Sequence, residues 1–247
     1  MRDHGILALR LTPSVLVAVG ILLAGCGPTK VTVDSSPDIE KYRVKTVAFM
    51  PFETLTTPQV IDLRDTELNA PRGMVRSDIT FAIPQTIEKF DQPTASVPPD
   101  VPAKVTQAVY ERLRHWQGLL VLSPEETARI ASSLKEKAAS LATADIAKQV
   151  AAQMVADGVL FGRVLVYQER DGGRWGGIGA TVGFEVKLVA ADGRTLWVGN
   201  YYEKQKPLNE DLFGFLQRGF GFVSADELVQ YGAEHVVQAF PFGAPAR

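Results

Sequence analysis

The sequence predicts an α/β fold in which helices pack on a mixed sheet containing a C-terminal antiparallel meander. Three observations predict it: short apolar runs typical of buried strands, helical periodicities between them, and three long strand-like runs in succession toward the C-terminus. The 247 residues are 46% hydrophobic and 22% charged, as in an ordinary globular chain. The length allows one sizeable domain or two small ones, and one domain with an insertion fits best.

The first predicted strand covers 47–52, an apolar run in which Pro51 cannot donate to a sheet ladder. The following stretch, 53–99, is rich in Thr, Pro, Gln and Asp, and only 78–83 alternates between polar and apolar residues. We expect a long insertion with one strand, which is either a functional loop or locally disordered.

Apolar residues at helical spacing predict a helix over 102–117, which Gly118 ends. The apolar run 119–122 predicts a short buried strand. Ser123 and Glu126 then have the spacing of a capping box, with a proline at the first helical position, so we expect a second helix to begin there.

A third helix is predicted over 144–156, capped by Thr143. It leads into three strand-like runs, 159–168, 178–190 and 195–204. In the middle run apolar and polar residues alternate, which predicts one buried and one largely wet face. Short connections make an antiparallel meander the expected arrangement.

The turn between the last two runs is Asp192-Gly193, a strong hairpin signal. A short aromatic region follows over 212–223. Ser224 and Glu227 repeat the capping-box spacing, so we expect a last helix from Ser224 to about residue 240.

The segment Leu23-Ala24-Gly25-Cys26 is a lipobox at the end of a predicted signal peptide. Arg2 and Arg10 make the start basic, and the apolar run 15–23 is well short of the ~20 residues that cross a bilayer. The alternative is a chance match to the lipobox. We expect export, acylation of the Cys26 sulfur by chains such as palmitate, and cleavage before Cys26.

This assignment divides the chain into a signal peptide (1–25), a lipidated cysteine with a polar tether (26–42), and a single domain (43–247) with the insertion at 53–99. A fully extended tether of this length would reach roughly 50 Å at ~3.3 Å per residue. Gly27 follows the cysteine in place of an aspartate retention signal. We therefore expect the outer membrane, with the domain facing the periplasm.

The sequence shows no catalytic constellation. Cys26 is the only cysteine, so acylation leaves no thiol for a disulfide, a zinc cluster or a nucleophile. His115 and His235 remain after cleavage, both at positions that suit structural roles, and no Gly-x-Ser-x-Gly elbow occurs. We expect no enzyme and no cofactor; a hydrolase requires one of these histidines in a cleft beside an acid and a hydroxyl.

Nucleic acid and metal ions are not expected ligands. The formal net charge is −2, and no basic stripe is present to bind phosphates. Asp62, Asp65 and Glu67 form a local acidic cluster, but its spacing matches no EF-hand loop. The cluster is either a calcium site or a solvated part of the insertion.

Two aromatic regions are candidates for partner binding. The glycine-rich run 172–179 precedes a strand, so it suits a hairpin tip and not a phosphate loop. Its Arg174 and Trp175 are predicted to contact a partner protein or a membrane surface, unless the indole folds back on its own sheet. The second region either packs under the last helix or forms an exposed patch; it contains Phe213, Phe215, Phe220 and Phe222.

Several of these segments resemble a known group. The lipoprotein leader, the strand end at 50–52, the helix start at 123–126 and the run 156–164 are similar to the periplasmic α/β domain shared by the curli-secretion channel lipoprotein, the lipoprotein activators of penicillin-binding proteins and the amino-terminal domain of TolB. The resemblance covers roughly 44–204. It implies binding to envelope proteins without catalytic residues, while the absence of two long amphipathic hairpins argues against a pore.

The sequence therefore predicts a non-enzymatic, outer-membrane-anchored lipoprotein whose periplasmic domain binds and assists a cell-envelope assembly for cell-wall synthesis, secretion or transport. The alternative is a periplasmic module that binds a small molecule or glycan, with 53–99 as a lid over the sheet. An exposed patch at the predicted aromatic regions would favour the first function. An apolar pocket under the insertion would favour the second.

Overall fold

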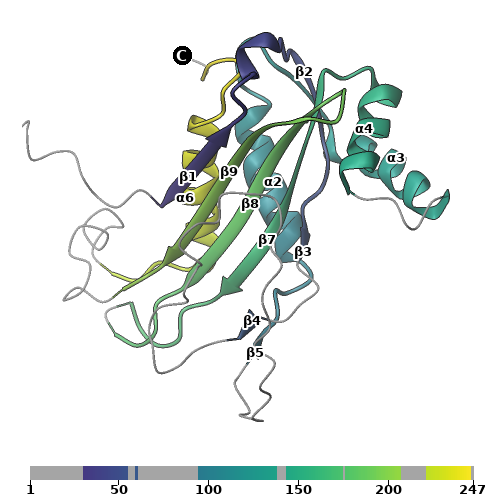
Figure 1. Ribbon diagram of the computed structural model, residues 1–247. Coiled ribbons are helices and arrows are strands. Elements are labelled where there is room, and N and C mark those ends of the chain that lie inside the picture. The colour runs from purple at the N-terminus through teal and green to yellow at the C-terminus, as the bar shows by residue number, and fades with distance from the viewer. Residues whose placement is uncertain are drawn as a thin grey trace, which may run out of the picture.

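A mixed seven-stranded sheet forms the centre of the molecule (Figure 1). The computed structural model describes residues 30–54, 59–60, 94–137, 143–174, 176–206 and 221–245. The sheet has the order β1-β9-β8-β7-β2-β6, and β3 pairs with β7 beyond the end of β2. The strands are β1 (Val31–Ser35), β2 (Thr46–Phe49), β3 (Glu53–Thr54), β6 (Leu120–Leu122), β7 (Gly158–Gln168), β8 (Thr181–Ala190) and β9 (Thr195–Lys204).

The sheet is parallel at one side and antiparallel at the other. β2 runs parallel to both β6 and β7, whereas β7, β8, β9 and β1 alternate in direction. The predicted α/β class and the predicted meander are therefore confirmed. β8 begins at Thr181, later than predicted, because Ile178 forms only an isolated bridge with Asp171.

Helices cover the two faces of the sheet unequally (Figure 1). α2 and α6 pack on one face, where the main hydrophobic core includes Phe184, Trp197 and Tyr201. α3 and α4 pack on the other face, over a smaller core with Met50 and Phe161 near the β2 side of the sheet. The helices are η1 (Ile39–Lys41, a 3-10 turn), α2 (Val101–Leu113), α3 (Pro124–Lys137), α4 (Thr143–Met154) and α6 (Ala225–Gln238).

Of the two predicted capping boxes, the structure contains the one at α6 and not the one at α3. The capping box of α6 is present: the Glu227 N–H donates to the Ser224 side chain, and the Glu227 carboxylate accepts from the Ser224 N–H. At α3 the predicted partner is wrong, because Ser123 Oγ contacts Glu125, whose N–H donates to it at 3.2 Å. α2 ends at Leu113, earlier than predicted, and a tight turn leads to Gly118 with φ +79°.

The N-terminal boundary of the folded domain is a correction. The sequence predicts a tether over 26–42, whereas β1 pairs with β9 along its whole length, from Val31 beside Tyr201 to Ser35 beside Trp197. An edge strand needs only backbone hydrogen bonds on one side, and four of the five side chains of β1, Val33 among them, are exposed, so no buried apolar face indicates the strand. The folded domain therefore includes Val31 and the rest of β1, which were predicted to belong to the tether.

The described ends of the insertion lie beside the sheet. β3 pairs with the second half of β7, and β4 (Gln59–Val60) pairs with β5 (Thr94–Ala95) as a separate two-stranded sheet. The predicted strand at 78–83 and the acidic cluster fall outside the described residues. Among the helices that the structure describes, none has the length and hydropathy needed to cross a membrane.

Candidate functional site

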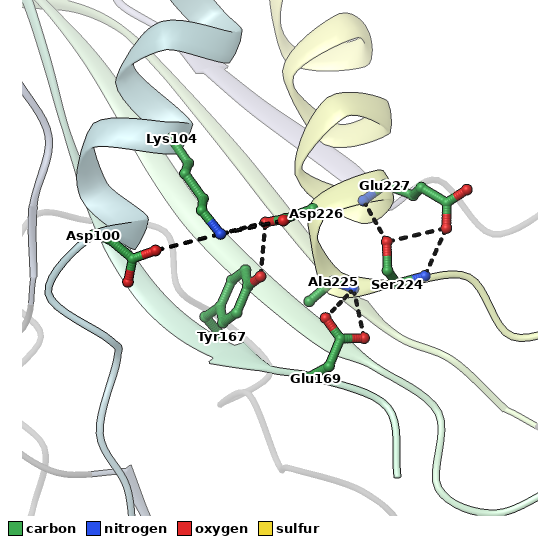
Figure 2. Close-up of polar contacts among 8 residues, drawn as sticks. All are labelled: Asp100, Lys104, Tyr167, Glu169, Ser224, Ala225, Asp226 and Glu227. Atoms are coloured by element: carbon green, nitrogen blue, oxygen red, sulfur yellow. Dashed lines mark hydrogen bonds and ion pairs between the residues drawn. The ribbon is translucent and has the colours of Figure 1, made fainter. Parts of the chain in front are cut away.

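Several segments that are distant in sequence meet at one end of the sheet, which we call the Lys30 end. β1 begins there, because its first residue pairs with Tyr201 near the end of β9. β7 ends and β8 begins there, since Gln168 pairs with Thr181. α6 starts at the same end, where Ala225 N–H donates to the Glu169 carboxylate just after β7 (Figure 2).

The hairpin between β7 and β8 forms the tip of this end. Arg174 is exposed there, and its carbonyl accepts a hydrogen bond from the Phe222 N–H at 2.8 Å. The Arg170 guanidinium donates to the Phe222 carbonyl at 2.8 Å. Gly221 has φ +150°, and a side chain there would collide with Arg174. The hairpin is thus fastened to the segment that leads into α6.

Two of the predicted partner-binding residues, Arg174 and Phe222, fall in the described chain, and they differ in exposure although they are hydrogen-bonded to each other. Phe222 is only 3% exposed, so its ring packs in the interior and is not part of a surface patch. Arg174 lies on the surface, as a contact residue must. The others, together with the predicted lipidation residue, lie outside the described residues: Cys26, Trp175, Phe213, Phe215 and Phe220.

Behind the hairpin, a polar group that we call the helix-end cluster joins α2, β7 and α6; it consists of Asp100, Lys104, Tyr167 and Asp226 (Figure 2). The Lys104 ammonium lies 3.3 Å from an Asp100 oxygen and 3.1 Å from an Asp226 oxygen. The Tyr167 hydroxyl donates to Asp226 at 2.7 Å. These contacts fix the first turns of two helices against the end of one strand.

The pKa shifts of Tyr167 and Asp226 favour a structural role for the helix-end cluster. Burial, with the Asp226 contact second, raises the pKa of Tyr167 well above its ordinary value. The hydrogen bond from Tyr167 lowers the pKa of Asp226, with Lys104 adding to the effect. Both shifts move the groups away from neutral pH, where a general acid or base would have to titrate.

Both histidines in the described ranges, His115 and His235, contact residues close to them in sequence. The Arg114 side chain donates to His115 Nε2 at 3.1 Å. His235 Nδ1 lies 2.9 Å from the Tyr231 carbonyl, and its ring stacks on that of Tyr231 with centroids 4.0 Å apart. Across the described part of the chain, no three His, Cys, Asp or Glu side chains gather as a metal site would require.

Sequence reasoning missed a polar strip on the sheet face opposite α2 and α6. Arg163, Glu185 and Asn200 are aligned across β7, β8 and β9, and Glu185 pairs with Lys187 at 3.0 Å. Both side chains of that pair are less than one-fifth exposed, so the face is not simply wet as predicted. The polar positions of β8 alternate correctly in sequence, but their burial depends on neighbours that sequence spacing does not reveal.

Three oxygen atoms on this face are buried without a hydrogen-bond partner among the described residues: Thr181 Oγ1, Asn200 Oδ1 and Tyr202 Oη. Burial alone raises the pKa of Tyr202 to about 12, so its hydroxyl is a neutral donor. Unpaired buried oxygens of this kind are costly unless a further group satisfies them.

Comparison with known proteins gives structural neighbours only. No family model and no curated protein matches the sequence. A PelC dodecamer from Paraburkholderia phytofirmans is 13% identical, with 87% of this chain and 98% of that chain covered and a TM-score of 0.45. The LpoB C-terminal domain from Escherichia coli is 12% identical, with 76% and 94% covered and a TM-score of 0.36.

Lipoprotein GNA1162 from Neisseria meningitidis is 16% identical, with 70% of this chain and 91% of that chain covered and a TM-score of 0.30.

Proposed function

We propose that this chain is a non-enzymatic lipoprotein, anchored in the outer membrane through Cys26, whose periplasmic domain binds and assists a cell-envelope assembly. The observation that carries the proposal is the lipobox, which places the lipid-accepting sulfur only four residues before the described domain begins at Lys30. A protein attached in this way acts on what lies near its membrane.

The described side chains support a binding role over a catalytic one. The ionisable groups of the helix-end cluster pair with one another, and each histidine contacts its own helix or a sequence neighbour. Exposed apolar side chains, by contrast, are available for contacts: Leu120 is 60% exposed on the β6 edge and Ile178 is 47% exposed on the hairpin. Partner proteins bind through such residues.

Fractionation and crosslinking test this function. We expect wild-type protein in the membrane fraction with acyl chains on Cys26, and Cys26→Ser protein released from it. A photo-crosslinking residue in place of Leu120 should join the anchored protein to one or a few envelope proteins in intact cells. The same residue at buried Phe222 serves as the control. An unacylated chain, or equal crosslinking at both positions, would refute the proposal.

The predicted contact residues of the hairpin tip provide a second test. We propose that Arg174 and Trp175 contact a partner protein or a membrane surface. Trp175→Ala should then weaken recovery of partners or membrane while leaving the thermal midpoint within a few degrees of wild type. If recovery is unchanged, the indole has no binding role.

A second candidate function is the binding of a polar small molecule or glycan on the polar strip. The unpaired oxygens of Thr181, Asn200 and Tyr202 favour it, because hydroxyl-rich ligands donate and accept in such settings. Tyr202→Phe removes one hydroxyl and little volume, so it should lower the affinity for a bound glycan in calorimetric titration with envelope polysaccharide fragments. Absence of binding by wild-type protein would exclude this function.

A further inference from the structure

We infer that the Lys30 end of the sheet lies against the lipid headgroups, with the β7–β8 hairpin tip at the membrane surface and the opposite end pointing away. The inference rests on the proposed anchoring through Cys26. It adds the orientation of the domain relative to the membrane, and it limits where a partner protein can lie.

The first step is the length of chain between the anchor and the sheet. Four residue steps separate Cys26 from Lys30, and a fully extended chain covers them with about 14 Å. The sequence-based estimate of roughly 50 Å assumed that residues up to 42 were free. Because the chain is hydrogen-bonded to β9 from Lys30 onward, the available reach is less than a third of that estimate.

The second step is that Lys30 is held in place. Its carbonyl accepts a hydrogen bond from the Tyr202 N–H at 3.1 Å. Its ammonium lies 2.8 Å from Glu203, whose side chain is 1% exposed. Separating Lys30 from β9 would break an ion pair with a buried carboxylate, which is strongly unfavourable. Lengthening the tether by releasing Lys30 is therefore unfavourable.

The third step is the direction of the strands. β1 runs from Lys30 toward Ser35, away from the anchor, and β8 connects the two ends of the sheet with ten residues, or about 30 Å. Leu120 pairs with Thr46 beside the start of β7, and the Asp192-Gly193 turn follows the end of β8, so both lie at the end opposite Lys30. With a 14 Å connection, only the Lys30 end can touch the bilayer when the strands are perpendicular to the membrane plane, which we call the upright orientation.

The remaining alternative is a domain that lies on its β1 edge. Residues 31–41, which form that edge and the following turn, carry Asp34, Asp38 and Glu40 against one cation, Lys41, a net charge of −2, and they also expose Val33. An anionic lipid surface repels such an edge. The hairpin between β7 and β8 carries Glu169 and Asp171 against Arg170 and Arg174, a net charge of zero, and it exposes the apolar side chain of Ile178. The upright orientation is therefore favoured.

The orientation restricts the partner. A folded domain of about 200 residues is roughly 40 Å across, so with the connection its far surface lies within about 60 Å of the bilayer. The partner is thus a protein embedded in, or lying close to, the same membrane. It binds the side surfaces or the end that carries Leu120.

Site-specific fluorescence quenching tests the orientation. Ile178→Cys and Leu120→Cys replace exposed apolar residues at opposite ends, and acylation of Cys26 leaves each variant with one free thiol. The acylated, full-length variants are labelled with the same fluorophore and inserted in phosphatidylethanolamine–phosphatidylglycerol vesicles that contain a headgroup nitroxide lipid. We expect at least about threefold stronger quenching at 178 than at 120, because the ends are ~30 Å apart.

Two further measurements complete the test. A Gly173→Cys label, at a position where an added Cβ meets no atom within 4 Å, replaces the 178 label if that variant unfolds. Twenty Gly/Ser residues inserted after Gly27 should reduce quenching at 178 to the level at 120, since such a linker spans about 25 Å on average. Equal quenching at both ends of the unextended, acylated protein overturns the inference. Failure of mass spectrometry to find acyl chains overturns the proposed function instead.

Discussion

At the scale of single residues, charged side chains in this protein differ greatly in what they contribute. Lys30 pairs with a carboxylate that is almost fully buried, whereas Lys41 pairs with Asp38 on the surface, with side chains 75% and 44% exposed. A buried charge that loses its partner is costly, while an exposed pair is screened by water and salt. Position in the fold, and not the type of residue, decides the effect of a substitution.

We therefore expect Lys30→Ala to lower the free energy of unfolding by up to about 3 kcal/mol, because the buried Glu203 carboxylate would lose its ion pair with Lys30 and keep the hydrogen bond from Tyr201. Lys41→Ala, the matched control, should change it by less than about 0.5 kcal/mol. Urea denaturation of the unacylated domain measures both. Similar effects for the two variants would show that the pairing of Lys30 and Glu203 contributes little.

A pH dependence is expected from Asp226. Its pKa is lowered in the folded state from the ordinary 3.8, so its contribution is complete above that value and is lost as the pH falls through the folded pKa. The difference in stability between wild type and Asp226→Asn should be constant near neutral pH and shrink below about pH 4. Because the side chain is 56% exposed, we expect a difference under about 1 kcal/mol.

The measurement for Asp226 is urea denaturation at several pH values. Asp34→Asn is the control, since Asp34 makes no salt bridge with any residue in the described ranges. A stability difference for Asp226→Asn that grows on acidification would contradict the assigned sign.

At the scale of elements, a glycine on α6 allows this helix to pack closely against the sheet. A Cβ added at Gly232 would lie 2.4 Å from a Tyr201 ring atom, and Tyr201 is fully buried in the main core. The Tyr201 hydroxyl donates to Glu203 at 2.8 Å, so the ring is held by a buried hydrogen bond as well as by packing. The close approach of helix and strand leaves no room for a side chain there.

Gly232→Ala should accordingly destabilise the protein by about 1–3 kcal/mol, although alanine is the better helix former. Gly173→Ala is a suitable control, because an added Cβ there meets no atom within 4 Å, and its effect should be near zero. Thermal unfolding followed by circular dichroism distinguishes the two. A stabilised Gly232→Ala variant would mean that α6 can move away from β9 without cost.

Removal of the helix cap of α6 is a milder change. Ser224→Ala deletes the side-chain acceptor of the Glu227 N–H and one half of the capping box. We expect a loss of about 1 kcal/mol, which is typical for an N-cap. Ser132→Ala, in the body of α3, should cost less, because Ser132 bonds only to a carbonyl within its own helix. Equal losses in chemical denaturation would argue against the cap.

At the scale of the whole molecule, regular alternation and helical spacing made most of the fold predictable. The meander could be predicted from the alternation of apolar and polar residues around Phe184, and the α6 cap from the spacing of Ser224 and Glu227. β1 was missed, because an edge strand with exposed side chains is stabilised by backbone bonds that no side-chain pattern reports. The polar strip was missed for a related reason: burial of Tyr202 depends on distant neighbours.

The pairing of β1 with β9 has a mechanical consequence. If the acyl chains hold one end of the protein while a partner holds the other, tension enters the fold at Lys30 and acts along the axis of β1. Antiparallel hydrogen bonds lie perpendicular to the strands, so this pull loads the whole β1–β9 ladder in shear instead of opening it one bond at a time. An edge strand placed at the anchor thereby allows the domain to bear force.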